Sequence, residues 1–321
     1  MNRPLNDVVR ERRKELRTLY ERAYSLFLDR LEVASTPKNF PLPYGLAEEV
    51  MQANWPHMPF VDHMIAGELT ETTNQLNAWG DWLLHLSLWA EVLSEFDEQD
   101  AWTIQHSYID PLAQVCLTQP SATRDRFGHI ATDAIHQANL CTVEGYKDHL
   151  IQDDRTRPLS REERENQIKI IGARWGKTSA FRQALTSLDT KTYRDATRNY
   201  RNLASHAIAP RFRFGITNMV ARSIRPVTEM VEQPNGTYVP TPHPSQKCVS
   251  YAFGGTEALD LQEVHRLSRQ EFDQAVRVFN AHPSPLVAGE QVNASWSIDF
   301  TSDALWAGRR FRTFNVIYDF S

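Results

Sequence analysis

A histidine and an arginine stand five residues apart in a segment whose other residues favour a helix. The segment reads Tyr-Arg-Asn-Leu-Ala-Ser-His-Ala, and its chemically active side chains are Arg201, Asn202 and His206. Cleavage of RNA without a metal needs a group that moves the protons of the 2′-hydroxyl and the leaving 5′-oxygen. Histidine titrates near neutrality and can do either, while arginine is a permanent, forked donor for the charged phosphorane. Asn202 could orient the phosphate or the imidazole.

Helical spacing sorts the side chains around this motif into three faces, at about 100° per residue. The face that we expect to be buried contains Tyr193, Ala196, Tyr200, Leu203, Ala204 and Ala207. A second stripe contains Arg194, Arg198, Arg201 and Ser205. A third stripe contains Asp195, Asn199, Asn202 and His206. An arginine stripe therefore lies beside a stripe of asparagine and histidine, and both are expected to point away from the core.

The charge along the chain is strongly uneven. Residues 194–225 contain seven Arg and a single acid, Asp195, whereas residues 39–123 contain twelve Asp and Glu and no Lys or Arg. A dense basic segment favours contact with a phosphate backbone. The acidic segment could pack near it, repel nucleic acid elsewhere, or bind a basic partner; a solvated face is the alternative for either run. We expect RNA phosphates to be bound by Arg194, Arg198, Arg211 and Arg213.

At this motif the sequence resembles HEPN domains, whose signature is an arginine, a polar residue, three further residues and a histidine. The resemblance is detailed over residues 191–213 and covers about 70–285 in architecture. HEPN domains are helical bundles, and many are ribonucleases of bacterial defence, toxin–antitoxin or RNA-processing systems. The resemblance implies a metal-independent endoribonuclease with no cofactor, in which Arg201 holds the scissile phosphate, His206 transfers protons and Asn202 is their polar neighbour.

The resemblance also implies partners. HEPN domains typically dimerise so that two motifs meet in one cleft, which implies a homodimer acting on RNA and leaving a 2′,3′-cyclic phosphate. Such an enzyme must be restrained, so an antitoxin or a sensor protein is a further expected partner.

Two other functions remain open from the sequence. The chain could be a non-catalytic HEPN-like module that uses this surface to bind RNA or protein. The motif itself could instead be structural, with Arg201 paired to acids of the acidic segment and His206 at a helix C-terminus, where a cation is favoured. The chain could also be a metal-dependent hydrolase built on His129, Asp133 and His136. These three share a helical face opposite apolar residues, and we expect that face to lie on the exterior.

The remaining pattern predicts a mainly α fold, a helical bundle with a small inserted β-hairpin region and a short β C-terminal tail. Trp82, Trp89 and Phe96, with leucines between them, indicate a core face. Asn235-Gly236 between β-prone residues predicts a hairpin. Helices are expected over residues 3–34, from near 70, over 100–117, from 120 to 150, over 160–188 after a capping box at Ser160, from 189 to before 210, and over 256–281.

Three regions follow from these elements. Residues 1–69 form a long helix and an irregular linker, 70–285 form the bundle with a β insertion at about 224–255, and 286–321 form a β-prone tail. The 321 residues include 41% apolar and 23% charged residues, as in ordinary globular proteins. We expect no membrane association and a cytoplasmic location, because no run could span a bilayer and the N-terminus lacks a signal peptide's apolar stretch. Cys116, Cys141 and Cys248 are too few and too scattered to predict disulfides or a cysteine zinc site.

Overall fold

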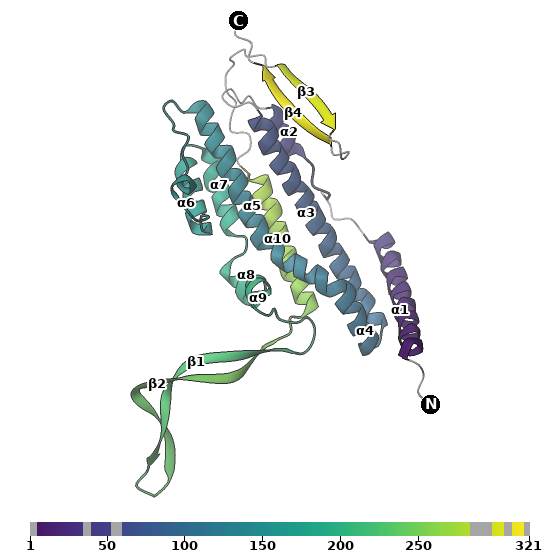
Figure 1. Ribbon diagram of the computed structural model, residues 1–321, viewed down its shortest axis with the longest axis vertical. Coiled ribbons are helices and arrows are strands. Elements are labelled where there is room, and N and C mark those ends of the chain that lie inside the picture. Colours follow the sequence, from purple (N-terminus) through teal and green to yellow (C-terminus); the bar gives the residue numbers. More distant parts are fainter. Residues whose placement is uncertain (1–4, 35–39, 53–59, 283–296, 305–309, 318–321) are drawn as a thin grey trace.

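The computed structural model describes residues 5–34, 40–52, 60–282, 297–304 and 310–317. The predicted fold class is confirmed, because helices dominate and the β structure consists of antiparallel pairs (Figure 1). Within these ranges the α-helices are α1 (Leu5–Val33), α2 (Gly45–Gln52), α3 (Val61–Val92), α4 (Glu98–Ile104), α5 (Asp110–Thr142), α6 (Arg161–Ile171), α7 (Gly176–Thr186), α8 (Lys191–Ala196), α9 (Tyr200–His206) and α10 (Leu261–Asn280). None of them combines the length and the apolar character that crossing a bilayer requires.

The core lies where the long helices α3, α5 and α10 pack together. The ring of Trp79 in α3 meets the edge of Phe272 in α10 with centroids 5.4 Å apart, and both side chains are buried. Phe127 of α5 packs against Phe279 of α10. Such aromatic pairs add to the apolar area that each ring buries. These contacts join helices that are far apart in the sequence into one bundle.

The predicted aromatic stripe forms part of this core. Trp89 is buried, whereas Trp82 and Phe96 are partly buried against the same cluster. Trp89 also attaches α1, because its ring stacks on Phe27 of α1 at 4.7 Å and on Tyr108 at 4.5 Å. The stripe therefore holds the N-terminal helix on the bundle as well as filling the interior.

Several predicted helix boundaries are wrong. One continuous helix, α5, passes through Pro120, where we expected a new helix to begin, and it ends at Thr142 rather than near 150. Pro120 removes a backbone donor, but it is buried and the surrounding packing keeps the helix intact. Gly145, at φ 73°, turns the chain after α5. The helix expected over 160–188 is divided into α6 and α7, and α3 begins at Val61 rather than near 70.

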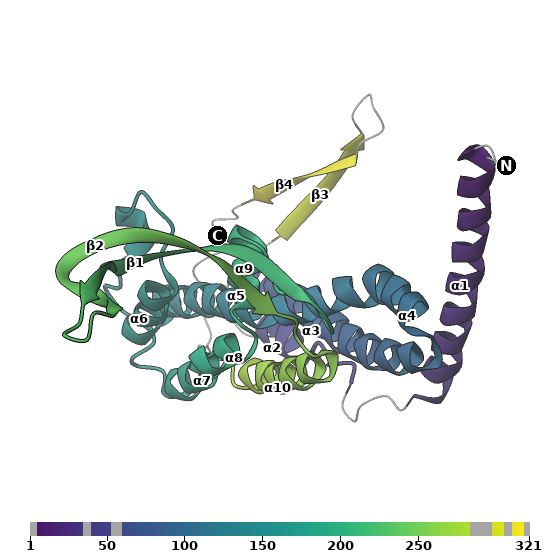
Figure 2. The ribbon, with the colours of Figure 1, turned by 90° about the horizontal axis from the view of Figure 1, so that it is seen from below.

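Two antiparallel strand pairs account for the β structure of the described residues. The hairpin of β1 (Ile216–Glu232) and β2 (Tyr238–Glu257) is longer than the predicted insertion over 224–255. Its turn contains Gly236 at φ 79°, as the Asn-Gly pair predicts. The hairpin projects away from the helical body (Figures 1 and 2). In the tail, β3 (Ser297–Ala304) pairs with β4 (Arg310–Ile317), in agreement with the predicted β C-terminal tail.

The three cysteines differ in their exposure. Cys116 in α5 is buried, and burial raises the pKa of its thiol to about 12. Cys141 is partly buried near the end of α5, and Cys248 is exposed on β2, where it pairs with Arg225 of β1. The three cysteine side chains therefore lie in three different environments.

Candidate functional site

The segment that carries the motif is not one helix. It is divided into α8 and α9, because Arg198 and Asn199 adopt left-handed backbone conformations with φ of 53° and 55°. Thr197 just before them is buried, and its hydroxyl donates to the carbonyl of Tyr193 at 2.9 Å. Asparagine tolerates the left-handed region better than most residues, and threonine back-bonding competes with helix propagation. The expectation of a continuous helix from 189 is therefore wrong.

This break also changes the faces. Tyr193 and Tyr200 are buried as predicted, with the Tyr193 hydroxyl donating to the carbonyl of Leu117 at 3.1 Å. Ala196 and Ala207, which we expected on the same face, are exposed. The Arg198 guanidinium turns toward the hairpin, where it donates to the backbone carbonyl of Glu257 and to its carboxylate. Arg198 therefore leaves the arginine stripe and fixes the end of β2 to the break.

Three of the predicted residues meet in one polar pocket of about 480 Å³. Arg194 precedes the break, and Arg201 and Asn202 begin α9. We name this cavity the arginine pocket; it is lined by Ser121, Asp125, His129, Leu159, Arg161, Arg164, Asp189, Arg194, Asn199, Arg201 and Asn202. Its walls come from α5, from the start of α6, and from the chain between 189 and 202. Side chains separated by up to eighty residues of sequence thus face one cavity.

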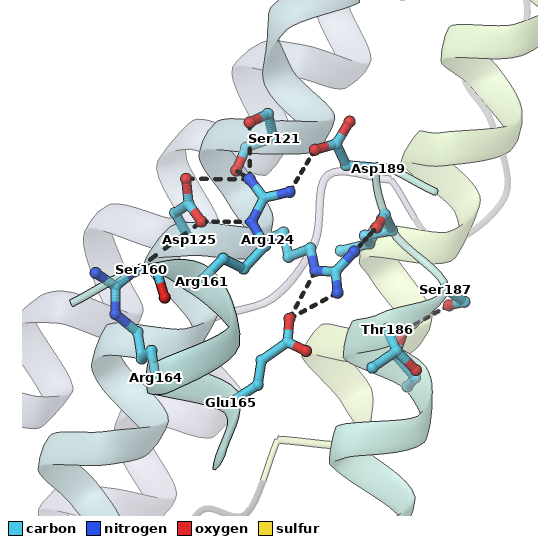
Figure 3. Close-up of polar contacts among 12 residues, drawn as sticks. Ser121, Arg124, Asp125, Ser160, Arg161, Arg164, Glu165, Thr186, Ser187 and Asp189 are labelled. Carbon is cyan, nitrogen blue, oxygen red and sulfur yellow. Dashed lines mark hydrogen bonds and ion pairs between the residues drawn. The ribbon is translucent and has the colours of Figure 1, made fainter. Parts of the chain in front are cut away.

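Arg161 organises the wall of the pocket, as Figure 3 shows. Its guanidinium donates to Asp125 at 2.9 Å, to Asp189 at 2.5 Å and to the hydroxyl of Ser121 at 2.9 Å. A forked guanidinium between two carboxylates is a rigid arrangement. Because these charges already neutralise each other, Arg161 acts mainly as a support for the neighbouring groups.

A second arginine strengthens the same junction. Arg124 of α5 donates to the carboxylate of Glu165 in α6 at 2.6 Å and to the carbonyl of Leu188 at 2.6 Å (Figure 3). Arg124 is not part of the pocket lining. It ties α5, α6 and the chain before α8 together behind the pocket, so the lining residues are held on a fixed frame.

The pocket carries more positive than negative charge. Four arginines and two aspartates line it. Arg194 lies 3.4 Å from the Asp189 carboxylate, and Arg164 lies 4.0 Å from Asp125. Within the described ranges no ion pair or hydrogen bond joins the Arg201 guanidinium to another residue. Arg201 is therefore available to bind an anion, and the excess of cations favours one.

Asp189 joins the pocket to the core. It is buried, has a left-handed backbone with φ 48°, and donates its backbone N–H to the carboxylate of Glu271 in α10 at 2.8 Å. Burial is the main cause that raises the pKa of Glu271 to about 7, and the nearby Asp189 carboxylate adds to the rise. Asp189 therefore connects the pocket to Glu271, a carboxyl group that titrates near neutral pH.

His129 is a lining residue that can exchange protons. Burial is the main cause that lowers its pKa, and the Arg164 guanidinium lowers it further, whereas Asp133 and Asp125 raise it. The neutral imidazole is therefore favoured, and a neutral imidazole can accept a proton. Arg164 lies closely against α5, since a Cβ at Gly128 would be 3.2 Å from its Cδ.

The proposed metal triplet does not share one exposed face. His136 is buried, with its ring nitrogens 2.9 Å from the Tyr146 hydroxyl and 2.9 Å from the Asp148 carboxylate. The expectation that all three lie on the exterior is wrong for His136, because the segment after α5 folds back over it. Among the residues with described positions, no group of three or more His, Cys, Asp or Glu side chains is arranged to hold a metal ion.

The other predicted residues lie outside the arginine pocket. His206 is exposed in the last turn of α9, and it is not part of the pocket lining. Arg211 donates its backbone N–H to the hydroxyl of Thr217, and the Arg213 guanidinium lies 4.6 Å over the Phe214 ring. These two arginines therefore flank the start of β1 and do not enter the pocket.

The sequence reasoning missed Arg161, Arg164 and Asp189 as members of the site. Arg161 and Arg164 sit in a mixed run of charges at the start of α6, which reads as an ordinary solvated helix end. Asp189 coincides with the predicted start of a helix, a position that indicates no binding role. His129 carries a weak signal, because it belongs to the predicted metal-ligand triplet. Only the packing of α5 against α6 brings these residues to the motif.

Comparisons with known proteins are limited. No family model matches the chain, and no solved structure does. Two proteins named "Low calcium response locus protein T", from Yersinia pestis and Yersinia pseudotuberculosis, are each 48% identical to this chain over 56 residues. The match covers 17% of this chain and 40% of the length of those relatives. The name that these two relatives share refers to a locus and describes no chemistry.

Proposed function

We propose that the protein is an endoribonuclease of the HEPN type that holds the scissile phosphate of RNA in the arginine pocket. The observation that carries this proposal is the meeting of Arg201 and Asn202 with three further arginines around one cavity. Arginine binds phosphate oxygens in forked pairs of hydrogen bonds, and a guanidinium without a protein partner loses no ion pair when it does so.

The proposed reaction needs no metal. A histidine removes the proton of the 2′-hydroxyl, the 2′-oxygen attacks phosphorus, and the bond from phosphorus to the 5′-oxygen breaks. The 5′-oxygen takes up a proton, which leaves a 2′,3′-cyclic phosphate and a 5′-hydroxyl. Arg201 stabilises the additional negative charge on the phosphorane, and Asn202 orients the phosphate.

His206 supplies the proton transfer in this proposal. It is exposed in the last turn of α9, outside the pocket of its own chain. A homodimer with the two α9 helices face to face would bring the His206 of one copy to the phosphate held by the other. Such a nuclease would act in bacterial defence or in toxin–antitoxin growth control, restrained by an antitoxin or a sensor protein.

The test is cleavage of a fluorescent single-stranded RNA by the purified full chain, with and without EDTA. We expect cleavage that survives EDTA, is absent on DNA of the same sequence, and falls by about a hundredfold or more in Arg201→Ala and His206→Ala. Arg17→Ala is the matched control, because Arg17 is an exposed arginine on α1 far from the motif in sequence. Intact RNA with the wild-type dimer, or equal cleavage by all variants, would overturn the proposal.

A non-catalytic RNA-binding module is the second candidate. The specific observation in its favour is that His206 does not line the arginine pocket. In that case Arg201→Ala weakens RNA binding, His206→Ala leaves binding unchanged, and the RNA remains intact with every variant. The same protein preparations separate the two candidates, because binding and cleavage are measured on one labelled RNA.

A further inference from the structure

The half of the β1–β2 hairpin nearest the helices has one strongly apolar face. Strand register places Val220 opposite Phe253, Arg222 opposite Tyr251 and Ile224 opposite Val249. Alternation along each strand puts these side chains on the same side of the ribbon. Tyr251 is 68% exposed and Phe253 is fully exposed. Two aromatic rings and several aliphatic side chains therefore stand uncovered in a row.

The other face of the same segment consists of small residues and of Arg225, whose guanidinium donates to the Ser223 hydroxyl on that face. Ala221 pairs with Ala252, and Ser223 pairs with Ser250. A two-stranded hairpin is only marginally stable by itself, and an exposed apolar face of this kind marks an interaction site. The side chains of the apolar face remain exposed, and the hairpin projects away from the helical body (Figure 1).

The charge of this segment identifies the kind of partner. We define the basal half of the ribbon as residues 211–226 and 247–256. It contains five cations and no Asp or Glu: Arg211, Arg213, Arg222, Arg225 and Lys247. The distal half, residues 227–246, contains two acids and no Lys or Arg. Two of these cations, Arg222 and Lys247, lie on the aromatic face itself. A second copy of this chain would bring like charges to this basic segment, whereas a polyanion would be attracted to it.

We propose that the basal half of the ribbon binds single-stranded RNA, with bases stacked on Tyr251 and Phe253 and phosphates bound by Arg222 and Lys247, which lie on the same face. Exposed aromatic rings interleaved with cations bind unpaired bases and the backbone between them. An apolar protein partner would cover the rings but would leave the cations without counter-charges. The choice of RNA as the ligand rests on the proposed nuclease function. The exposed aromatic rings and the positive charge of the basal half are observed independently of that function.

The foot of the ribbon is joined to the candidate site. Arg198, at the break between α8 and α9, donates to the backbone carbonyl and to the carboxylate of Glu257, the last residue of β2. Arg201 and Asn202 follow that break directly. An RNA strand held on the basal half would therefore be attached next to the segment whose arginines line the pocket.

The experiment uses the full chain and a short fluorescein-labelled 2′-O-methyl oligouridine. This probe lacks the 2′-hydroxyl, so it can bind but cannot be cleaved. We expect the double variant Tyr251→Ala/Phe253→Ala to raise the Kd by about tenfold to a hundredfold, as for the loss of one or two stacked bases. The double variant Arg222→Gln/Lys247→Gln should reduce the slope of log K against log salt by about one to two.

The matched control is Tyr238→Ala/Val239→Ala in the distal half, where both side chains are also exposed but lie among acids. Unchanged affinity in the Tyr251/Phe253 variant, or an equal loss in the control, overturns the proposal. A shift from dimer to monomer in light scattering, with RNA affinity unchanged, shows instead that a second copy covers this face.

The ribbon proposal and the nuclease proposal can fail separately in these experiments. If the Tyr251/Phe253 variant cleaves RNA like the wild type and binds the probe equally well, the ribbon proposal fails while the nuclease stands. If the variant loses the probe and Arg201→Ala does not affect cleavage, the ribbon proposal stands and the pocket proposal fails. A single-stranded DNA of the same length shows whether the surface distinguishes the sugar.

Discussion

The guanidinium of Arg161, at the first residue of α6, donates a hydrogen bond of 2.5 Å to the carboxylate of Asp189, just before α8. The Asp189 side chain is 6% exposed and that of Arg161 is 27% exposed, so this ion pair is largely shielded from water. It connects the two segments that form opposite parts of the arginine pocket.

Replacing Asp189 with Asn should destabilise the protein by about 3 kcal/mol, because removal of one partner leaves a poorly hydrated guanidinium with less counter-charge. Asparagine accepts the left-handed backbone that residue 189 requires, so the effect reports the charge. The measurement is urea unfolding followed by circular dichroism. Glu21→Gln is the control, because its ion pair with Arg17 is exposed to solvent and should contribute little to stability. Equal losses in both variants would contradict the assignment.

Glu271 should make stability depend on pH. Its pKa in the folded protein is raised to about 7 from an ordinary value of 4.5, mainly by burial. A raised pKa stabilises the folded protein below pH 4.5, and this stabilisation is lost as the pH rises through 7. Glu271→Gln keeps an oxygen that can accept the Asp189 N–H but carries no charge. We expect the variant to gain stability relative to wild type between pH 5.5 and pH 8.5, by about 1 to 3 kcal/mol.

The measurement for this prediction is the difference in free energy of unfolding between variant and wild type at those two pH values. Taking the difference removes the contributions of the other titrating groups that both proteins share. A difference that is the same at both pH values, or that favours the wild type at high pH, would show that Glu271 is ionised in the folded protein at an ordinary pKa.

Ser160 should stabilise the start of α6. Its hydroxyl accepts the N–H of Glu163, and the Glu163 carboxylate accepts the N–H of Ser160 at 2.8 Å. Ser160→Ala removes the first of these bonds and should cost about 1 kcal/mol in unfolding experiments. Ser94→Ala is a suitable control, since the Ser94 hydroxyl only donates to a carbonyl of its own helix. A loss in the control as large as that of Ser160→Ala would argue against a capping effect.

The pKa of His129 should respond to Arg164. The guanidinium lowers the pKa because it repels the protonated imidazole, so Arg164→Gln should raise it. The ring resonances followed by NMR as a function of pH measure this directly. Arg174→Gln serves as the comparison, because Arg174 lies over the Trp175 ring and does not line the pocket. A pKa of His129 that stays constant in Arg164→Gln would remove Arg164 as a cause.

Features of the fold that depend on local chemistry were predictable. The capping box at Ser160 and the Asn-Gly turn at Gly236 each depend on a few neighbouring residues, and both are confirmed. Features that depend on contacts between residues far apart in the sequence were not predictable. Pro120 normally interrupts a helix, but packing overrides that preference in α5. The break at Asn199 coincides with the ion pair between Arg198 and Glu257. No local pattern predicts a contact between residues 59 positions apart.

The candidate site follows the same division. Arg194, Arg201 and Asn202 are grouped by their spacing, and they do reach one pocket. Helical spacing also places Arg198 and His206 near these residues. Because the helix is broken, Arg198 turns to Glu257 and His206 lies outside the pocket. The other half of the pocket comes from α5 and α6, where Asp125 accepts from Arg161, 36 residues further along the chain. One sequence contains the residues of such a site but not the packing that joins them.

The distribution of the thiols makes the ribbon accessible to site-specific labelling without mutagenesis. Burial and a raised pKa protect Cys116 from alkylation, whereas Cys248 is exposed on β2 beside the proposed RNA surface. A maleimide dye should therefore react fastest at Cys248 and report RNA arrival as a change in its emission. In a dimer, spin labels on the two Cys248 side chains would report the distance between the two ribbons by electron paramagnetic resonance. The ribbon contains no tryptophan, so its position cannot be followed by intrinsic tryptophan fluorescence.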